Sequence, residues 1–137
     1  MMNIIYWTWC LPQTLLGFLL FVIYKIILKD IYCFGYRNKT RGITSRRILG
    51  GLSLGKYIFL NRKVWLKIDR SFLLHEYGHT RQSLILGPLY LIIIGIPSLL
   101  WATYFTIRFL IFKDLKKGDY YNFYTERWAD ALGGVKR

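Results

Sequence analysis

Acidic residues are scarce in this chain of 137 residues, because seven Asp and Glu stand against 20 Lys and Arg, for a net charge of +13. Cysteine is also rare: Cys10 and Cys33 are the only two, and their spacing matches no metal or redox motif. We therefore expect two free thiols, and a disulfide-rich scaffold is excluded. Only two histidines are present, so an imidazole site has to use both.

Hydrophobic residues make up 54% of the chain, and the mean hydropathy is positive at +0.28. This content excludes an intrinsically disordered protein, and it exceeds that of ordinary soluble domains. A lipid bilayer with basic segments at its surface accommodates both the apolar content and the positive charge. The length allows one domain, so we predict a single integral membrane domain over residues 1–137.

The order of apolar and polar stretches predicts an α-helical membrane protein with a small β-hairpin, of the α+β class. Residues 1–24 contain no charged side chain, and a helix of 17 residues spans about 25 Å, close to the thickness of the hydrocarbon core. The hairpin is expected from strand-forming residues at 52–60 and 64–68, with a turn between them. The predicted segments are a transmembrane helix at about 12–28, a basic β-containing segment at 31–70, a helix at 71–86, an apolar hairpin at 88–112 and a last helix at 120–132.

The sequence His75-Glu76-Tyr77-Gly78-His79 carries the chemistry. It is an H-E-x-x-H motif on a predicted helix, where residues four apart share a face, so both imidazoles can bind one metal ion. Glu76 projects to the neighbouring side, where it can take a proton from water on the metal. A third protein ligand is then needed, with the fourth position left to water.

A second motif is Glu126-Arg127-Trp128-Ala129-Asp130, and its Glu126 is the only Glu in the chain besides Glu76. With both motifs, the chain resembles the gluzincin metallopeptidases, and most closely the membrane-integrated branch with the CAAX-processing proteases, the heat-shock membrane proteases and the β-lactam sensor proteases. The resemblance covers about ten motif residues and the apolar segments between them. It implies that Zn is ligated by His75, His79 and Glu126, that Glu76 is the catalytic base, and that Asp130 accepts the second N–H of a ligand histidine.

Geometry permits these roles, because Glu126 and Asp130 are four apart on one helix face. The alternative for Glu126 is a surface acid paired with a nearby Lys or Arg. Gluzincins also offer a His or Tyr to the oxyanion, and no third His exists here. The candidates that remain are Tyr120, Tyr121, Tyr124 and Arg127.

The substrate of such enzymes pairs with an edge strand ahead of the H-E-x-x-H helix, and 52–60 is the candidate by position. An ordinary strand is the equally good alternative.

The apolar run 88–112 constrains the topology. One spanning helix would place His79 and Glu126 on opposite sides of the bilayer, so a shared metal predicts a hairpin that turns near Gly95 and Pro97. The rival interpretation is a plain spanning helix at 89–111, with Glu126 outside the site. Basic residues flank the run on both sides, which favours a site on the cytoplasmic side of a bacterial inner or cell membrane.

We therefore expect a small integral membrane zinc metallopeptidase that acts on a peptide or protein substrate in contact with the lipid bilayer. The alternative is a metal-binding membrane protein without catalysis, a degenerate relative or a subunit. Nucleic-acid binding by the basic 31–70 segment is a third hypothesis, which we reject because charge at a membrane surface explains the same residues more simply. The sequence specifies neither the substrate nor the oligomeric state.

Overall fold

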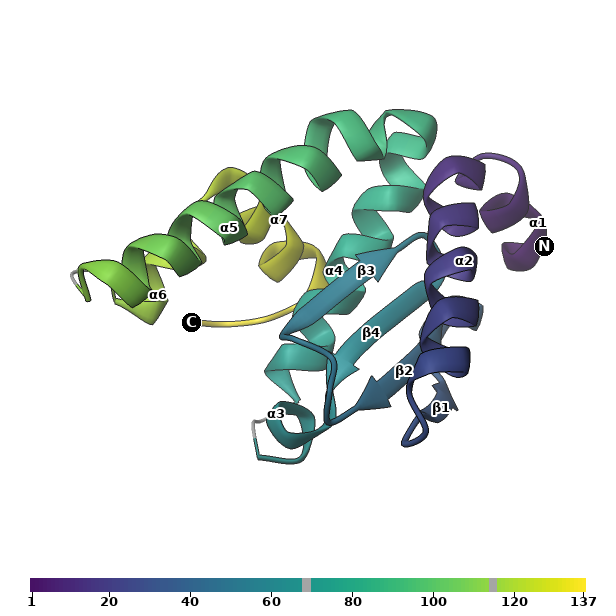
Figure 1. Cartoon of the computed structure of the whole chain (residues 1–137). Helices are drawn as coiled ribbons and strands as arrows, with labels where there is room; N and C mark the ends of the chain where they lie inside the picture. Colours follow the sequence, from purple (N-terminus) through teal and green to yellow (C-terminus); the bar gives the residue numbers. More distant parts are fainter. Residues whose placement is uncertain (68–69, 114–115) are drawn as a thin grey trace.

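A four-stranded sheet lies between helices in the computed structural model (Figure 1). The structure describes residues 1–67, 70–113 and 116–137. The chain is mostly helical, and the predicted α+β class is confirmed. The strands are β1 (Tyr32–Gly35), β2 (Arg41–Ser45), β3 (Gly51–Leu54) and β4 (Tyr57–Asn61). The helices are α1 (Met2–Trp7), α2 (Leu11–Ile27), η1 (Arg37–Lys39), α3 (Arg62–Lys67), α4 (Ser71–Leu86), η2 (Gly87–Leu89), η3 (Leu91–Gly95), α5 (Ile96–Ile111), α6 (Lys117–Tyr120) and α7 (Tyr124–Gly133).

The strand order β1-β2-β4-β3 places β4 inside the sheet and β3 at its edge. β1 is antiparallel to β2, β2 is parallel to β4, and β3 is antiparallel to β4. A turn at Gly55 and Lys56 joins β3 to β4, and it requires the positive φ of +59° at Gly55, which glycine adopts without a steric penalty. The edge strand is therefore the short first arm of a hairpin.

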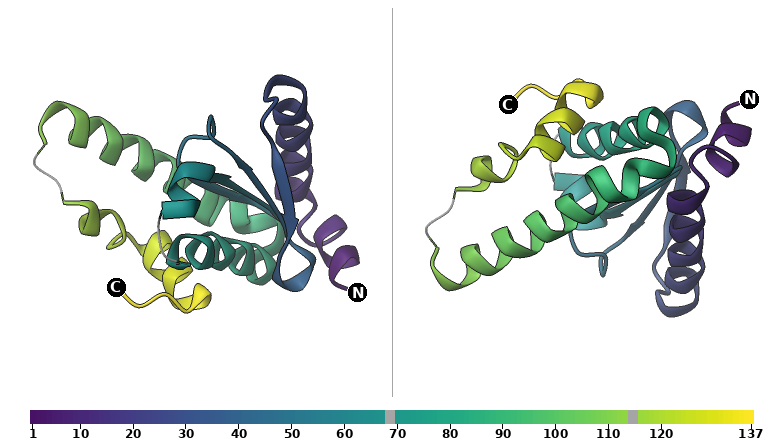
Figure 2. Two further views of the ribbon diagram at one scale, coloured as in Figure 1. Left: turned by 90° about the horizontal axis from the view of Figure 1, so that it is seen from below. Right: turned by 90° about the horizontal axis from the view of Figure 1, so that it is seen from above.

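Successive residues of β4 point to opposite faces of the sheet, and their side chains pack against a different helix on each face. Tyr57 and Phe59 belong to an apolar cluster with residues of α2, and Ile58 and Leu60 belong to a second cluster with residues of α4. Figure 2 shows the same arrangement from two further directions, with α2 and α4 on opposite faces of the sheet. The sheet thus fixes α4, which carries the H-E-x-x-H motif.

The predicted strand pair is wrong in detail. Both arms of the hairpin lie within residues 51–61, and 62–67 form α3 rather than a second strand; residue 68 of the predicted strand lies outside the described residues. The Asn61 side chain explains the difference, because its Oδ1 accepts hydrogen bonds from the backbone N–H groups of Lys63 and Val64 and so caps a helix. β1 and β2 were not predicted.

The predicted hairpin in the apolar run is also wrong. Helical structure continues from Leu91 to Ile111, and Gly95 and Pro97 do not turn the chain. Gly95 ends a π-helical segment, and Pro97 follows it in the first turn of α5. The Ile93 carbonyl, which lies four residues before Pro97 and receives no N–H from it, accepts a hydrogen bond from the Tyr124 hydroxyl. The change of direction comes earlier, at Gly87, whose φ is +54°.

The rival interpretation is correct in its continuous helix and wrong in leaving Glu126 outside the site, because the chain returns along α5. The Trp101 indole N–H donates to the Tyr120 carbonyl oxygen at 2.9 Å, and its ring stacks on Phe123 at 4.8 Å between centroids. The Tyr124 hydroxyl donates to the Ile93 carbonyl oxygen at 2.6 Å. Residues 120–124 therefore run back beside the helix and bring α7 to α4, so a continuous apolar helix and a contribution from Glu126 are compatible.

One helix among the described residues, Leu91–Ile111, is long and apolar enough to cross a membrane. Only 11% of its most apolar stretch is buried, and it projects away from the sheet (Figure 2). α2, in the region predicted to span, is apolar but shorter, at 17 residues. Seven of the large apolar side chains that η3 and α5 leave exposed recur at helical spacing: Ile92, Ile96, Leu99, Leu100, Ile107, Leu110 and Ile111. We call these seven residues the apolar stripe.

Candidate metal centre

Two glycines allow α4 and α7 to approach closely. A Cβ atom at Gly78 would lie 1.9 Å from the Ala129 carbonyl oxygen, and one at Gly133 would lie 2.1 Å from the Leu74 carbonyl oxygen. No side chain fits at either position, so the two backbones are in direct contact. This contact sets the distance between the H-E-x-x-H helix and the side chains of α7.

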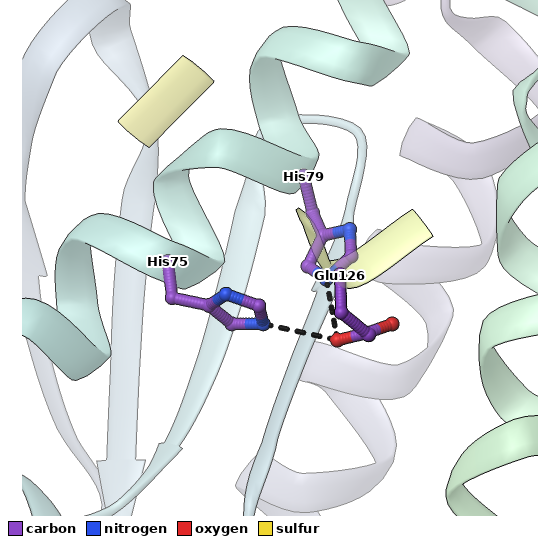
Figure 3. A group of neighbouring side chains, drawn as sticks. All are labelled: His75, His79 and Glu126. Carbon is purple, nitrogen blue, oxygen red and sulfur yellow. Dashed lines mark hydrogen bonds and ion pairs between the residues drawn. The ribbon is translucent and has the colours of Figure 1, made fainter. Parts of the chain in front are cut away.

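The predicted ligands converge at this crossing. His75 and His79 point from one side of α4 towards Glu126 of α7 (Figure 3). The His75 Nε2 atom lies 3.1 Å from Glu126 Oε2, and the His79 Nε2 atom lies 3.5 Å from the same oxygen. All three residues are buried, and one ligand atom from each lies within 4.8 Å of the others. The structure therefore brings together the three residues that the sequence predicted.

Each imidazole has a second partner that fixes its orientation. The Nδ1 atom of His75 lies 2.7 Å from Asp130 Oδ1, the contact that the resemblance implied. The Nδ1 atom of His79 lies 2.7 Å from Gln82 Oε1, and the Gln82 amide in turn donates to the Thr125 carbonyl oxygen at 2.8 Å. Because the amide group donates from its nitrogen, its oxygen accepts from His79 Nδ1–H. The Nε2 atoms of both imidazoles then face Glu126.

Sequence reasoning missed Gln82. It lies three residues after His79, so the two share a helix face, and this spacing was the available signal. Gln82 is fully buried. It differs from Asp130 in being neutral, so the two ligand histidines have backing groups of different charge.

The two oxygens of Glu126 have different surroundings. Oε1 accepts hydrogen bonds from the hydroxyls of Ser98 at 2.5 Å and Thr125 at 2.9 Å. Oε2 faces the imidazoles. These hydroxyls hold the carboxylate so that one oxygen is presented to a metal ion, and Ser98 links α5 to the site.

The electrostatics favour a cation between these groups. Burial lowers the pKa of His75, but hydrogen bonds to Asp130 and Glu126 outweigh it and raise the pKa to about 9. Burial raises the pKa of Glu126, but the hydrogen bonds with His75 and His79 outweigh it and hold the pKa well below its usual range. A carboxylate with two imidazoles around it suits a divalent cation, which replaces the proton that His75 otherwise carries. The residues therefore fit a metal ion, and the cluster could hold one.

Glu76 is placed beside this cluster without taking part in it. The Ser53 hydroxyl oxygen lies 2.8 Å from Glu76 Oε2 and 2.8 Å from its backbone carbonyl oxygen. Gly51 leaves room for the carboxylate, since a Cβ there would lie 2.2 Å from Glu76 Oε1. Glu76, His79 and Glu126 line one cavity of about 330 Å³. The Glu76 carboxylate, the ligand cluster and space for a substrate therefore adjoin.

The structure separates the four candidates for the oxyanion. Tyr120 lines the same cavity as Glu76. Tyr121 instead packs edge-to-face on His75, with ring centroids 5.2 Å apart. The Tyr124 hydroxyl is bound to a backbone carbonyl of η3, and Arg127 is exposed. Tyr120 alone of the four borders the cavity.

The edge strand next to the cavity is β3. Gly51, Leu52, Ser53 and Leu54 all line the cavity. The predicted strand 52–60 is two strands in the structure, β3 and β4. Of these two, β4 lies inside the sheet with neighbours on both sides, so only β3 offers a free edge on this side. Any pairing with an extended peptide is therefore confined to four residues.

Comparison with known protein families, curated proteins and solved structures finds no match to this chain. The resemblance to gluzincins therefore stays an expectation from the two sequence motifs.

Proposed function

We propose that this protein is a small membrane-bound zinc metallopeptidase. The observation that carries the proposal is the buried His75, His79 and Glu126 cluster with the Glu76 carboxylate in the adjoining cavity. Two imidazoles and one carboxylate, with a fourth position left open, are the ligand set of zinc hydrolases such as thermolysin. The low pKa of Glu126 supports its role as an anionic ligand.

The proposed reaction assigns a task to each side chain. Bound zinc supplies Lewis acidity, which polarises the peptide carbonyl and acidifies water. Glu76, oriented by Ser53, takes a proton from the attacking water and delivers it to the leaving amine as the C–N bond breaks. Tyr120 borders the cavity where the carbonyl oxygen gains charge, and its hydroxyl stabilises that charge by a hydrogen bond. Burial raises the pKa of Tyr120, which keeps this donor protonated.

The bilayer is the proposed environment of α2 and α5. The apolar stripe is too extensive to be left in water, because patches of this kind mark membrane or protein contacts. The opposite side of α5 packs on the returning segment through Trp101 and Phe105, which leaves the stripe available to face lipid. The basic residues that flank the apolar run on both sides support a site on the cytoplasmic side.

The substitution Glu76→Gln tests catalysis separately from metal binding. Zinc per chain and hydrolysis of a mixed peptide library are measured on the full chain in detergent. We expect about one zinc per chain in the wild type and in Glu76→Gln, with a 10²- to 10⁴-fold loss of hydrolysis in the variant.

The exposed Asp119→Asn is the matched control, because it also removes one carboxylate, and it should retain activity. Unchanged turnover in Glu76→Gln contradicts the mechanism. Zinc without hydrolysis in the wild type leaves the alternative, a metal-binding membrane protein without catalysis.

A further inference from the structure

The cavity beside Glu76 is lined by two kinds of residue. The polar ones include the groups of the site, and most of the others are apolar. Its apolar walls come from three regions that are far apart in the sequence, namely α2, the edge strand β3 and the run from η3 into α5. The large apolar residues that line it are Leu16, Leu52, Leu54, Leu91, Ile96 and Leu99.

Positive charge is excluded from this cavity. The chain has 20 Lys and Arg, yet within the described part of the chain none of them lines it. The charged groups there are the carboxylates of Glu76 and Glu126, whose two negative charges a divalent metal would balance. An acidic side chain would approach the Glu76 carboxylate with no Lys or Arg beside it, and a basic one would find both carboxylates already engaged by Ser53 and by the histidines. An uncharged apolar side chain has neither penalty.

The cavity opens onto the exposed apolar surface. Leu16 of α2 and Leu99 of α5 line it, and they are also 46% and 63% exposed. Leu99 belongs to the apolar stripe, so a group that enters here crosses an apolar surface. Two small residues, Gly95 and Ala102, leave space along the wall formed by η3 and α5.

We propose that this cavity is the specificity pocket and that it takes an aliphatic side chain next to the scissile peptide bond. The substrates would then be apolar peptide segments. The inference rests on the proposed function, because it uses the metal site to define where the scissile bond lies. Ala102 sets the size of the pocket, and it is a specificity-determining residue rather than a catalytic one.

Hydroxamates test the pocket through binding. A hydroxamate anchors to zinc, and its side chain then probes the adjacent space. The probes are four acyl hydroxamates that differ only in a methyl, isobutyl, carboxymethyl or aminobutyl group, with dissociation constants measured calorimetrically on the zinc-loaded full chain. We expect the isobutyl compound to bind about 10- to 100-fold more tightly than the methyl compound, and both charged compounds to bind no better than methyl. Equal affinities across the series, or the best affinity for a charged group, overturn the proposal.

Ala102→Phe tests whether the cavity causes the tighter binding of the isobutyl compound. It should abolish the isobutyl advantage and leave the zinc content and the methyl affinity unchanged. The matched control is Thr103→Phe, which adds a ring of the same size at the next, exposed position and should retain the advantage. Ala102→Leu repeats the measurement with a smaller side chain if the phenylalanine variant does not retain zinc. An isobutyl advantage that survives both Ala102 variants refutes the assignment of the pocket.

The Glu76→Gln variant separates this inference from the peptidase proposal. It should bind the series with the wild-type order of affinities while losing hydrolysis. An isobutyl preference in a wild-type protein that cleaves no peptide leaves the pocket intact and rejects the peptidase. Hydrolysis with no side-chain preference rejects the pocket and leaves the peptidase.

Discussion

The crossing of α4 and α7 at Gly78 provides the strongest test of the site geometry. In Gly78→Ala, the new Cβ would lie 1.9 Å from the Ala129 carbonyl oxygen, whereas contacts under 3.0 Å are essentially never seen. The two backbones have to separate locally by about 1 Å, an overpacking strain that costs about 1–3 kcal/mol of folding free energy. Metal–ligand distances tolerate about 0.2 Å. Glu126 therefore moves out of reach of a metal held by the histidines.

We expect Gly78→Ala to fold and to lose at least about 100-fold in zinc affinity, more than a typical loss of an outer partner. The assay is competition with a chromophoric chelator, beside circular dichroism and the unfolding midpoint in detergent. Gly35→Ala is the matched control, because a Cβ at Gly35 meets nothing within 4 Å. Wild-type zinc affinity in a folded Gly78→Ala protein would refute the reasoning, since it would show that Glu126 is not held through this contact.

Three further predictions concern the ligands and the groups that bind to them. Gln82→Leu removes the acceptor for His79 Nδ1–H, so zinc affinity should fall about 10- to 100-fold. Gln82→Glu retains an acceptor and should bind zinc more tightly than Gln82→Leu. Chelator competition that ranks the two variants otherwise contradicts this role of Gln82. Ser98→Ala removes one of the hydroxyls that donate to Glu126 Oε1 and should weaken zinc binding about tenfold; no change would show that Ser98 does not hold the carboxylate. Because the pKa of metal-free His75 is about 9, it is protonated at pH 7, and zinc should displace about one proton there and fewer above pH 9. Calorimetry in buffers of different ionisation enthalpy measures this release, and zinc uptake without it is the contrary outcome.

The ligand residues could be predicted from the sequence because their arrangement is local. The 3.6-residue period places His75 beside His79, and Glu126 beside Asp130, whatever the rest of the chain does. Gln82 follows the same rule and was overlooked because an amide does not bind zinc itself. Ser98 and Ser53 had no such signal, since each reaches the site from an element distant in sequence.

The errors in the fold arose where tertiary contacts decide between alternatives. Residues 64–67 contain residues that favour strands, but the Asn61 cap starts a helix there. Gly95 and Pro97 favour a turn, yet both positions are compatible with helix where they stand, and the chain turns at Gly87 instead. The argument that a shared metal requires a hairpin within 88–112 failed because it assumed that the chain continues away from the apolar helix after its end. Only the three-dimensional structure shows that the chain returns beside the helix, where Trp101 contacts it.

The contact between His75 and Glu126 joins residues 51 positions apart in the chain. A metal ion bound there would act as a cross-link, and closing a loop of that length removes about 4 kcal/mol of entropy from the unfolded chain. The loop contains the whole of α5, which has little buried surface of its own to keep it in place. Zinc would therefore hold α5 in place in addition to its role in catalysis. Removal of zinc by a chelator should increase the mobility of α5 before it unfolds the sheet.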